Sequence, residues 1–188
     1  MQRLIQRLED YRPVCEQEAR DRRLMLEHLR TGKNPLSRDN ETAHFTASSW
    51  IVSPDKRQVL MVYHNLYGSW SWSGGHADGD PDLHAVARRE AQEETGVSLL
   101  LSPLGDQPIS VEILPVYGHE KRGRYVSTHL HYNMTYLLIA DPASPVTVKP
   151  DENSAVAWFS AEEALADPTE YWMVDMVYRK LHERVRYL

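Results

Sequence analysis

The chain has 188 residues, 41% hydrophobic and 26% charged, with a formal net charge of −6, which excludes disorder as its overall state and favours one domain with a core of its own. The negative charge argues against a nucleic-acid polymer or an anionic membrane as a partner. The single cysteine, Cys15, excludes an intrachain disulfide, and no apolar stretch reaches the roughly 20 residues of a membrane span, so we expect a cytoplasmic protein.

Two helices are expected first. Leu4 and Leu8 have helical spacing, and a second helical stretch runs over residues 14–30. We therefore divide the chain into an N-terminal helical extension at residues 1–40 and a main domain at residues 41–188. The amphipathic pattern of the extension fits a cover over a functional site or the interface of a homodimer.

The main domain begins as a series of strands. Runs rich in β-branched and aromatic residues occupy residues 44–52, 58–64, 69–73, 109–120, 129–140 and 154–159. A helix is expected over residues 81–95, and a C-terminal helix carries an apolar stripe of Tyr171, Val174, Tyr178, Leu181, Val185 and Leu188. This order favours an α/β (α+β) sandwich with a mixed sheet and helices on both faces.

The helix over residues 81–95 has well-marked ends. Asp80 is suited to cap its N-terminus, Pro81 to occupy its first position, and Asp82 to lie at the positive end of the helix dipole. Gly96 is suited to the C-terminal cap. The segment therefore predicts a short helix that follows a glycine-rich turn.

Three carboxylates of this helix lie on the arc that holds its apolar stripe. At about 100° per residue, that stripe consists of Leu83, Val86, Ala87 and Ala91. Glu90 and Glu94 fall inside it and Glu93 lies at its edge. Such carboxylates repel one another and are costly to desolvate, and a bound cation removes both penalties. Oxygen ligands favour Mg²⁺, with Mn²⁺ as a substitute; the alternative is a solvated acidic face paired with Arg88 and Arg89.

The segment at residues 75–97 resembles the Nudix box, G-x5-E-x7-R-E-U-x-E-E-x-G-U, in which U is aliphatic. The matching positions are Gly75, Arg89, Glu90, Ala91, Glu93, Glu94, Gly96 and Val97, with alanine a mild substitution at the first U. Pro81 replaces the early glutamate, and we interpret Asp80, Asp82 or the helix cap as taking over part of its role. The similarity to Nudix hydrolases extends over residues 44–159.

The resemblance implies a Nudix-type α/β/α sandwich and a Mg²⁺-dependent hydrolase. Its small-molecule substrate would contain a nucleoside diphosphate linked to another moiety, and water would attack one phosphorus of the diphosphate. Glu90 and Glu94 would bind the metal, Glu93 would be a ligand or activate the water, and the carbonyl of Gly75 would be a further ligand. Arg89 would orient the carboxylates through charge-assisted hydrogen bonds.

Charged residues outside the box are further candidates. Glu152 precedes an expected strand, in a region from which Nudix enzymes often bring another carboxylate to the metal; the alternative is an ordinary exposed loop residue. Lys121, Arg122 and Arg124 form a basic run that is suited to substrate phosphates, or else a solvated hairpin loop.

Aromatic side chains supply another set of candidates. Trp70 and Trp72 share a strand face, where they would either stack on a base or pack in the core. His129 and His131 also share a strand face and would either line a site or form a packed pair. His76, directly after the first glycine of the box, is a candidate for substrate contact.

Two other functions are alternatives. Residues 44–50 and the Gly-His pair at 75–76 are similar to the isopentenyl-diphosphate isomerase branch of the same fold. That isomerase has a catalytic cysteine just before the pair, where this chain has Ser73 and Gly74, and Cys15 lies among the N-terminal helices. The other alternative is a Nudix-like module that binds a nucleotide without turnover, and the nearly complete box argues against it.

Overall fold

The computed structural model describes residues 1–121, 123–166 and 171–188. Its helices are α1 (Gln2–Asp10), α2 (Glu16–Thr31), α3 (Leu83–Thr95), α4 (Ala161–Ala164), α5 (Tyr171–Met173), the π-helical turn η2 (Val174–Tyr178) and α6 (Arg179–Arg186). Its strands are β1 (Ala43–Val52), β2 (Gln58–His64), β3 (Ser69–Ser71), β4 (Ser73–His76), β5 (Ser110–Val116), β6 (His119–Lys121), β7 (Arg124–Val126), β8 (His129–Ile139) and β9 (Asn153–Ser160). No helix in the described ranges has the length and apolar composition to cross a membrane.

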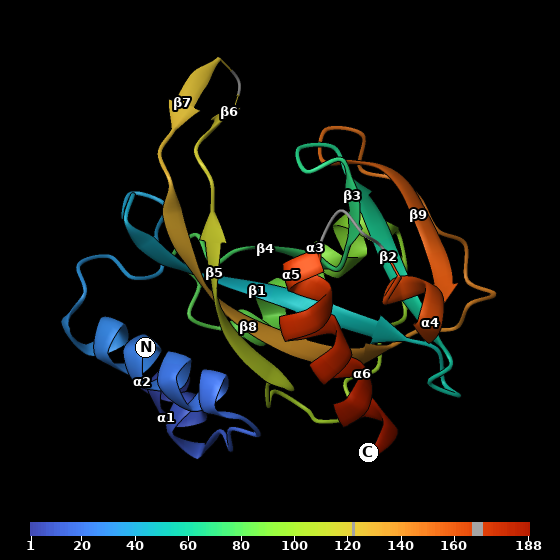
Figure 1. The fold of residues 1–188 in the computed structure, drawn as a ribbon, viewed down its shortest axis with the longest axis horizontal. Coiled ribbons are helices and arrows are strands. Elements are labelled where there is room, and N and C mark those ends of the chain that lie inside the picture. Colours follow the sequence, from blue (N-terminus) through green and yellow to red (C-terminus); the bar gives the residue numbers. More distant parts are fainter. Residues whose placement is uncertain (122, 167–170) are drawn as a thin grey trace.

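A mixed sheet forms the centre of the molecule. Its strand order is β3-β2-β1-β8-β5, with β4 paired to β1 and β9 paired to β2. β1 and β8 run parallel over ten residue pairs, from Ala43 opposite Leu130 to Val52 opposite Ile139. The other pairs of this sheet are antiparallel. β6 and β7 form a separate hairpin that projects from the body of the molecule (Figure 1).

Both faces of β1 are covered, because its side chains alternate between two helical layers. Phe45 and Ala47 belong to a core cluster that also contains residues of α1, α2 and α3. On the opposite face, Trp50 stacks on Tyr178 of η2 with ring centroids 5.2 Å apart, in a second cluster shared with α6. The helices α5 and α6 lie in front of the sheet and α3 behind it (Figure 1). The expected sandwich with a mixed sheet is confirmed.

The N-terminal helices pack on this framework. Leu4 of α1 and Met25 of α2 are buried in the same cluster as residues of α3. Arg7 of α1 is only 5% exposed; it pairs with Asp106, and its Nη1 lies 3.4 Å from Oδ1 of Asp82 at the start of α3. The first two helices therefore share a core with the sheet, and α1 contacts the N-cap of α3 through Arg7.

The C-terminal helical stretch differs from the expected stripe at its ends. The middle of the stripe is buried, at Val174, Tyr178, Leu181 and Val185. Tyr171 and Leu188, by contrast, are 72% and 58% exposed, so their expected packing is wrong. The wider π-helical turn of η2 rotates the preceding residues away from the α-helical stripe, and Leu188 lies beyond the end of α6.

Candidate active site

The glycine-rich strand β4 forms the floor of the candidate site. Its Gly75 lies opposite Ala47 of β1. A Cβ atom on Gly75 would lie 2.5 Å from Cδ of Glu90, so only glycine allows the α3 side chain to rest on the strand. The neighbouring Gly74 donates its N–H to Oε2 of Glu94 at 3.1 Å. The backbone of β4 thus touches both inward carboxylates of α3.

The caps of α3 determine which residues face β4. Asp82 is the N-cap, and its side chain accepts a hydrogen bond from the backbone N–H of Ala85. The expected cap at Asp80 and the expected helical position of Pro81 are therefore wrong, because the helix begins two residues later. Asp80 instead accepts a hydrogen bond from the N–H of Asp82 at 2.9 Å. At the other end, Gly96 adopts the expected left-handed cap conformation, with φ of 74°.

Three carboxylates converge at this point. Ligand oxygens of Glu90, Glu94 and Glu152 all lie within 4.8 Å of one another. Glu152 arrives from the loop before β9. Asn153 fixes that loop, because its side chain donates to the carbonyl of Glu94 at 3.0 Å and accepts from the N–H of Lys149 at 3.1 Å. The structure therefore brings Glu152 to the two glutamates of α3, and its role in catalysis stays a prediction.

The environment of these carboxylates disfavours their charged forms. Burial raises the pKa of Glu94 to about 8, and the nearby Glu152 and Glu90 add repulsion that the N–H of Gly74 opposes in part. Burial also raises the pKa of Glu90, against the lowering effect of Lys149. Several oxygen donors that repel one another in a desolvated place fit a hard divalent cation such as Mg²⁺ or Mn²⁺.

Lys149 is a member of the site that the sequence analysis missed. Its Nζ lies 3.0 Å from Oε2 of Glu93 and 2.9 Å from Oε2 of Glu152. The two carboxylates raise the pKa of this ammonium group. Its position three residues before Glu152 was the available signal, since a loop that brings a carboxylate to an acidic helix also brings its neighbours. Lys149 supplies a positive charge between Glu93 and Glu152, at the edge of the three converging carboxylates.

Glu93 and Arg89 form the outer side of the cluster. Glu93 is 46% exposed, so its carboxylate meets solvent as well as Lys149. Nη1 of Arg89 lies 3.7 Å from Oδ2 of Asp80, and Nη2 lies 3.9 Å from Oε1 of Glu90. The guanidinium group thus lies between the start of α3 and its first inward glutamate. At these distances its effect is electrostatic, without close hydrogen bonds.

The expected phosphate-binding residues lie on the β6–β7 hairpin. Lys121 and Arg124 face each other there and are exposed, while Arg122 lies outside the described residues. The charge of Lys121 contributes to lowering the pKa of His64 and of His76, although burial contributes more.

The two tryptophans make contacts with core residues. The ring centroid of Trp70 lies 4.7 Å from that of Phe159, and the ring centroid of Trp72 lies 5.6 Å from that of Tyr178. Both are partly buried against the cluster that includes Trp50. His76, His129 and His131 lie together beside His44, where the ring of His76 is 4.9 Å from that of His131.

Comparisons with known proteins agree on the family and the fold. The model of the NUDIX domain matches residues 43–180. The structure of an Ap4A hydrolase from C. elegans is similar with a TM-score of 0.53 at 16% identity, covering 77% of this chain and 98% of that one. The structure of the Nudix hydrolase RenU from M. smegmatis has a TM-score of 0.52 at 15% identity, and the match covers 77% of this chain and 87% of that one. The structure of the E. coli dihydroneopterin triphosphate pyrophosphohydrolase has a TM-score of 0.51 at 17% identity, and the match covers 72% of this chain and 92% of that one. No curated protein matches the chain in sequence.

Proposed function

This chain belongs to the NUDIX family and is a Nudix hydrolase, and we propose that it cleaves the diphosphate bond of a small molecule in which a nucleoside diphosphate is linked to another moiety. One observation carries the proposal. Oxygen atoms of Glu90, Glu94 and Glu152 converge within 4.8 Å, beside a strand whose glycine leaves room for Glu90. Such a convergence is costly without a cation, and a cation there would lie where phosphoryl oxygens can bind.

The proposed cofactor is Mg²⁺, with Mn²⁺ as a substitute. Glu90, Glu94, Glu152 and the carbonyl oxygen of Gly75 are the groups that would hold it. When bound, the cation would neutralise charge on the phosphoryl oxygens and acidify a bound water. The carboxylate oxygens and the carbonyl oxygen form a donor set that suits this hard ion.

Glu93 is the proposed general base. It is half-exposed, and its carboxylate is held by Lys149 at 3.0 Å, so it can accept a proton from the attacking water and pass it to solvent. A P–O bond to the incoming hydroxyl then forms while the bond between phosphorus and the bridging oxygen breaks. Arg89 helps to orient Glu90 from 3.9 Å.

Residues on the substrate side of the proposal are Lys121, Arg124, Trp72 and His76. Lys121 and Arg124 would attract the negative phosphates, as exposed cations on a projecting hairpin can. Trp72 and His76 would contact the part of the substrate next to β4. Their positions at or near the glycine-rich strand support this assignment.

The experiment is an assay of Glu93→Gln with Mg²⁺ against a panel of nucleoside diphosphate derivatives. The panel includes Ap4A and dihydroneopterin triphosphate, because similar structures carry those names. Release of phosphate, pyrophosphate and nucleoside monophosphate is followed. We expect a loss of turnover of about 100-fold or more, with the melting temperature unchanged. The matched control is Glu162→Gln on the exposed face of α4.

Full activity of the Glu93→Gln variant would remove Glu93 from the mechanism. A folded wild-type protein that binds Mg²⁺ but turns over no member of the panel would overturn the hydrolase proposal. In that case, NMR of isopentenyl diphosphate and calorimetry with nucleotides would distinguish the isomerase from the binding module.

A further inference from the structure

Four histidines lie on one face of the sheet, away from the carboxylates. His44 of β1 is directly opposite His131 of β8 in the parallel ladder. His129 precedes His131 by two residues, and His76 of β4 pairs with Thr46, two residues beyond His44. Because side chains two apart share a face, the register of three strands brings these four imidazoles together.

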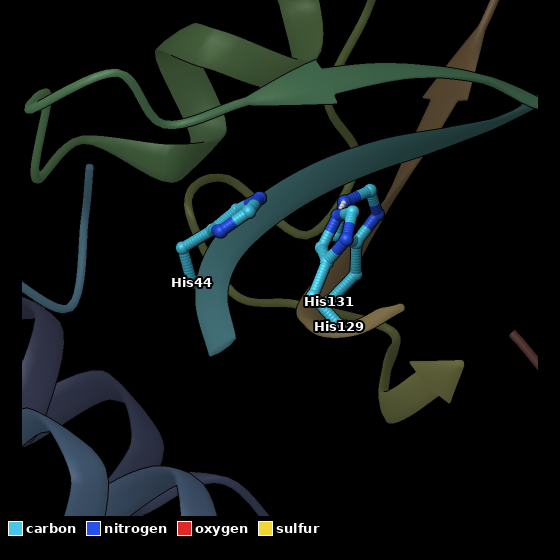
Figure 2. Close-up of side chains that lie close together, drawn as sticks. All are labelled: His44, His129 and His131. Atoms are coloured by element: carbon cyan, nitrogen blue, oxygen red, sulfur yellow. Dashed lines mark hydrogen bonds between the residues drawn. The ribbon is translucent and has the colours of Figure 1, made fainter. Parts of the chain in front are cut away.

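Three of the imidazoles have metal-ligand spacing. Nε2 of His131 donates a hydrogen bond to Nε2 of His129 at 3.1 Å, and an ion would replace this bond. The separation is close to the ~3.3 Å between two nitrogens bound tetrahedrally at the usual Zn–N distance. Ligand nitrogens of His44, His129 and His131 all lie within 4.8 Å of one another. A shift on the order of 1 Å would therefore bring all three onto one ion. Figure 2 shows the rings of His129 and His131 side by side, with His44 across from them on β1.

Backbone carbonyls fix the tautomers of two of these histidines. Nδ1 of His44 lies 2.9 Å from the carbonyl oxygen of Asn40, and Nδ1 of His129 lies 2.8 Å from that of Ser127. A carbonyl oxygen only accepts, so each Nδ1 carries the proton and each Nε2 keeps its lone pair. Metal-binding histidines are commonly oriented in this way by a second hydrogen bond.

One of the available nitrogens lacks a partner. His44 is 3% exposed, and its buried Nε2 has no hydrogen-bond partner among the described residues. A buried polar atom without a partner is costly, and an ion bound by this lone pair would remove the cost.

We propose that His44, His129 and His131 bind a transition-metal ion of the Zn²⁺ class, at a site separate from the carboxylates. An all-imidazole donor set favours such an ion over Mg²⁺, which prefers oxygen. The ring centroid of His76 lies 5.2 Å from that of His44 and 4.9 Å from that of His131, so His76 lies beside the three ligands. The ion would join β1 to β8, next to β4, the strand that carries Gly75.

The test measures metal content, which does not depend on turnover. Untagged protein is stripped with a chelator, equilibrated with Zn²⁺ in the presence of excess Mg²⁺, dialysed and analysed by mass spectrometry of its metals. We expect about one Zn²⁺ per chain in the wild type, as for a single closed site. A Glu90→Gln/Glu94→Gln variant and the control His182→Gln, a histidine of α6, should retain it. His129→Gln/His131→Gln should lose it.

A second readout keeps the result independent of folding defects. Co²⁺ in place of Zn²⁺ should give the visible absorption of a tetrahedral nitrogen site in the wild type and in the carboxylate variant. The single variant His44→Gln, checked for folding by circular dichroism, should lose this band. Zn²⁺ that follows the carboxylates, or that persists in folded variants of the three histidines, would overturn the proposal. A wild-type protein that retains no Zn²⁺ would overturn it as well.

Discussion

Glu94 shows how one residue joins the strand, the helix and the chemistry of the site. Its carboxylate is buried, accepts a hydrogen bond from the N–H of Gly74, and has a pKa raised to about 8. A helix selected for stability alone would carry an apolar residue at this position, because burial of a carboxylate is costly. The sequence predicted Glu90, Glu93 and Glu94 through helical spacing, and it predicted Gly75 through the resemblance to the Nudix box.

Lys149 was not predictable in the same way. Its contacts with Glu93 and Glu152 depend on how the loop before β9 folds against the end of α3. That fold is fixed by Asn153, through hydrogen bonds to the backbone of Glu94 and Lys149. No periodic pattern marks a loop, so the sequence offered only the position of Lys149 three residues before Glu152, and the ion pairs themselves appear only in the structure.

We predict that Lys149→Met will increase the stabilisation by Mg²⁺. In the wild type, the Lys149 ammonium group already neutralises part of the carboxylate charge, so a cation gains less on binding. Without it, the protein in chelator should melt at a lower temperature. The rise on adding Mg²⁺ should then be greater than in the wild type by roughly 2–4 °C, the shift that about 1 kcal/mol produces in a chain of this size.

The measurement is the melting temperature with and without Mg²⁺, for both proteins. Lys149→Arg keeps the positive charge and is the control, which should behave like the wild type. If Mg²⁺ raised the melting temperature of Lys149→Met and of the wild type by the same amount, the Lys149 ammonium group and Mg²⁺ would not neutralise the same carboxylates.

At the scale of elements, the attachment of α1 depends on a charged contact. Arg7 is nearly buried and pairs with Asp106, which precedes β5, and with Asp82 at the start of α3. The hydrogen bond from Arg7 holds the pKa of Asp106 below its usual value. Loss of this partner would leave a buried guanidinium group with a weaker set of acceptors.

We therefore predict that Asp106→Asn will lower the free energy of unfolding by about 1–3 kcal/mol at neutral pH. Because the pKa of Asp106 is lowered on folding, its contribution is present above the ordinary value near 3.8 and is lost as the pH falls through the folded value. The difference between the wild type and the variant should shrink below about pH 4. Urea unfolding at several pH values measures it, with the exposed Asp39→Asn as control. A difference that stays constant with pH would contradict the ion-pair explanation.

Local sequence patterns predicted the helices and strands better than they predicted the contacts between these elements. The strands and α3 follow from alternation and from helix-ending residues, and most of their bounds agree with the structure to within a few residues. The π-helical turn η2 was missed because it breaks the periodicity used to find the C-terminal stripe, which placed Tyr171 and Leu188 wrongly. The cap of α3 was displaced by two residues because Asp80 and Asp82 are equally good cap residues.

The whole molecule has a net charge of −6, which opposes the approach of an anionic substrate. The projecting β6–β7 hairpin carries the exposed cations Lys121 and Arg124. Local positive charge on an otherwise acidic protein can raise the concentration of a phosphate ester near the site. The sequence predicted this basic run. It could not predict which way the hairpin projects from the molecule, because that depends on where β5 and β8 end.

We predict that Lys121→Ala/Arg124→Ala will raise the KM for the best diphosphate substrate by about 10-fold at low salt, the effect of losing about 1.4 kcal/mol of attraction. The increase should diminish at high salt, where charges are screened, and kcat should change little. The control is Arg20→Ala/Arg57→Ala, which removes two exposed arginines from other surfaces. An unchanged KM at low salt would contradict a role for the hairpin in binding.

The parallel pairing of β1 with β8 also determines when the protein can fold during its synthesis. Residues 43–52 have to wait for residues 129–139 before the centre of the sheet can close. Until then, only β2 and β4 are present to pair with β1, and β5, against which α2 packs, has no strand to pair with because β8 lies between it and β1. The nascent chain therefore leaves the ribosome with an open strand edge and uncovered apolar helix faces. The strand edge and the apolar helix faces that a chaperone can bind are therefore most exposed in the interval before β8 emerges.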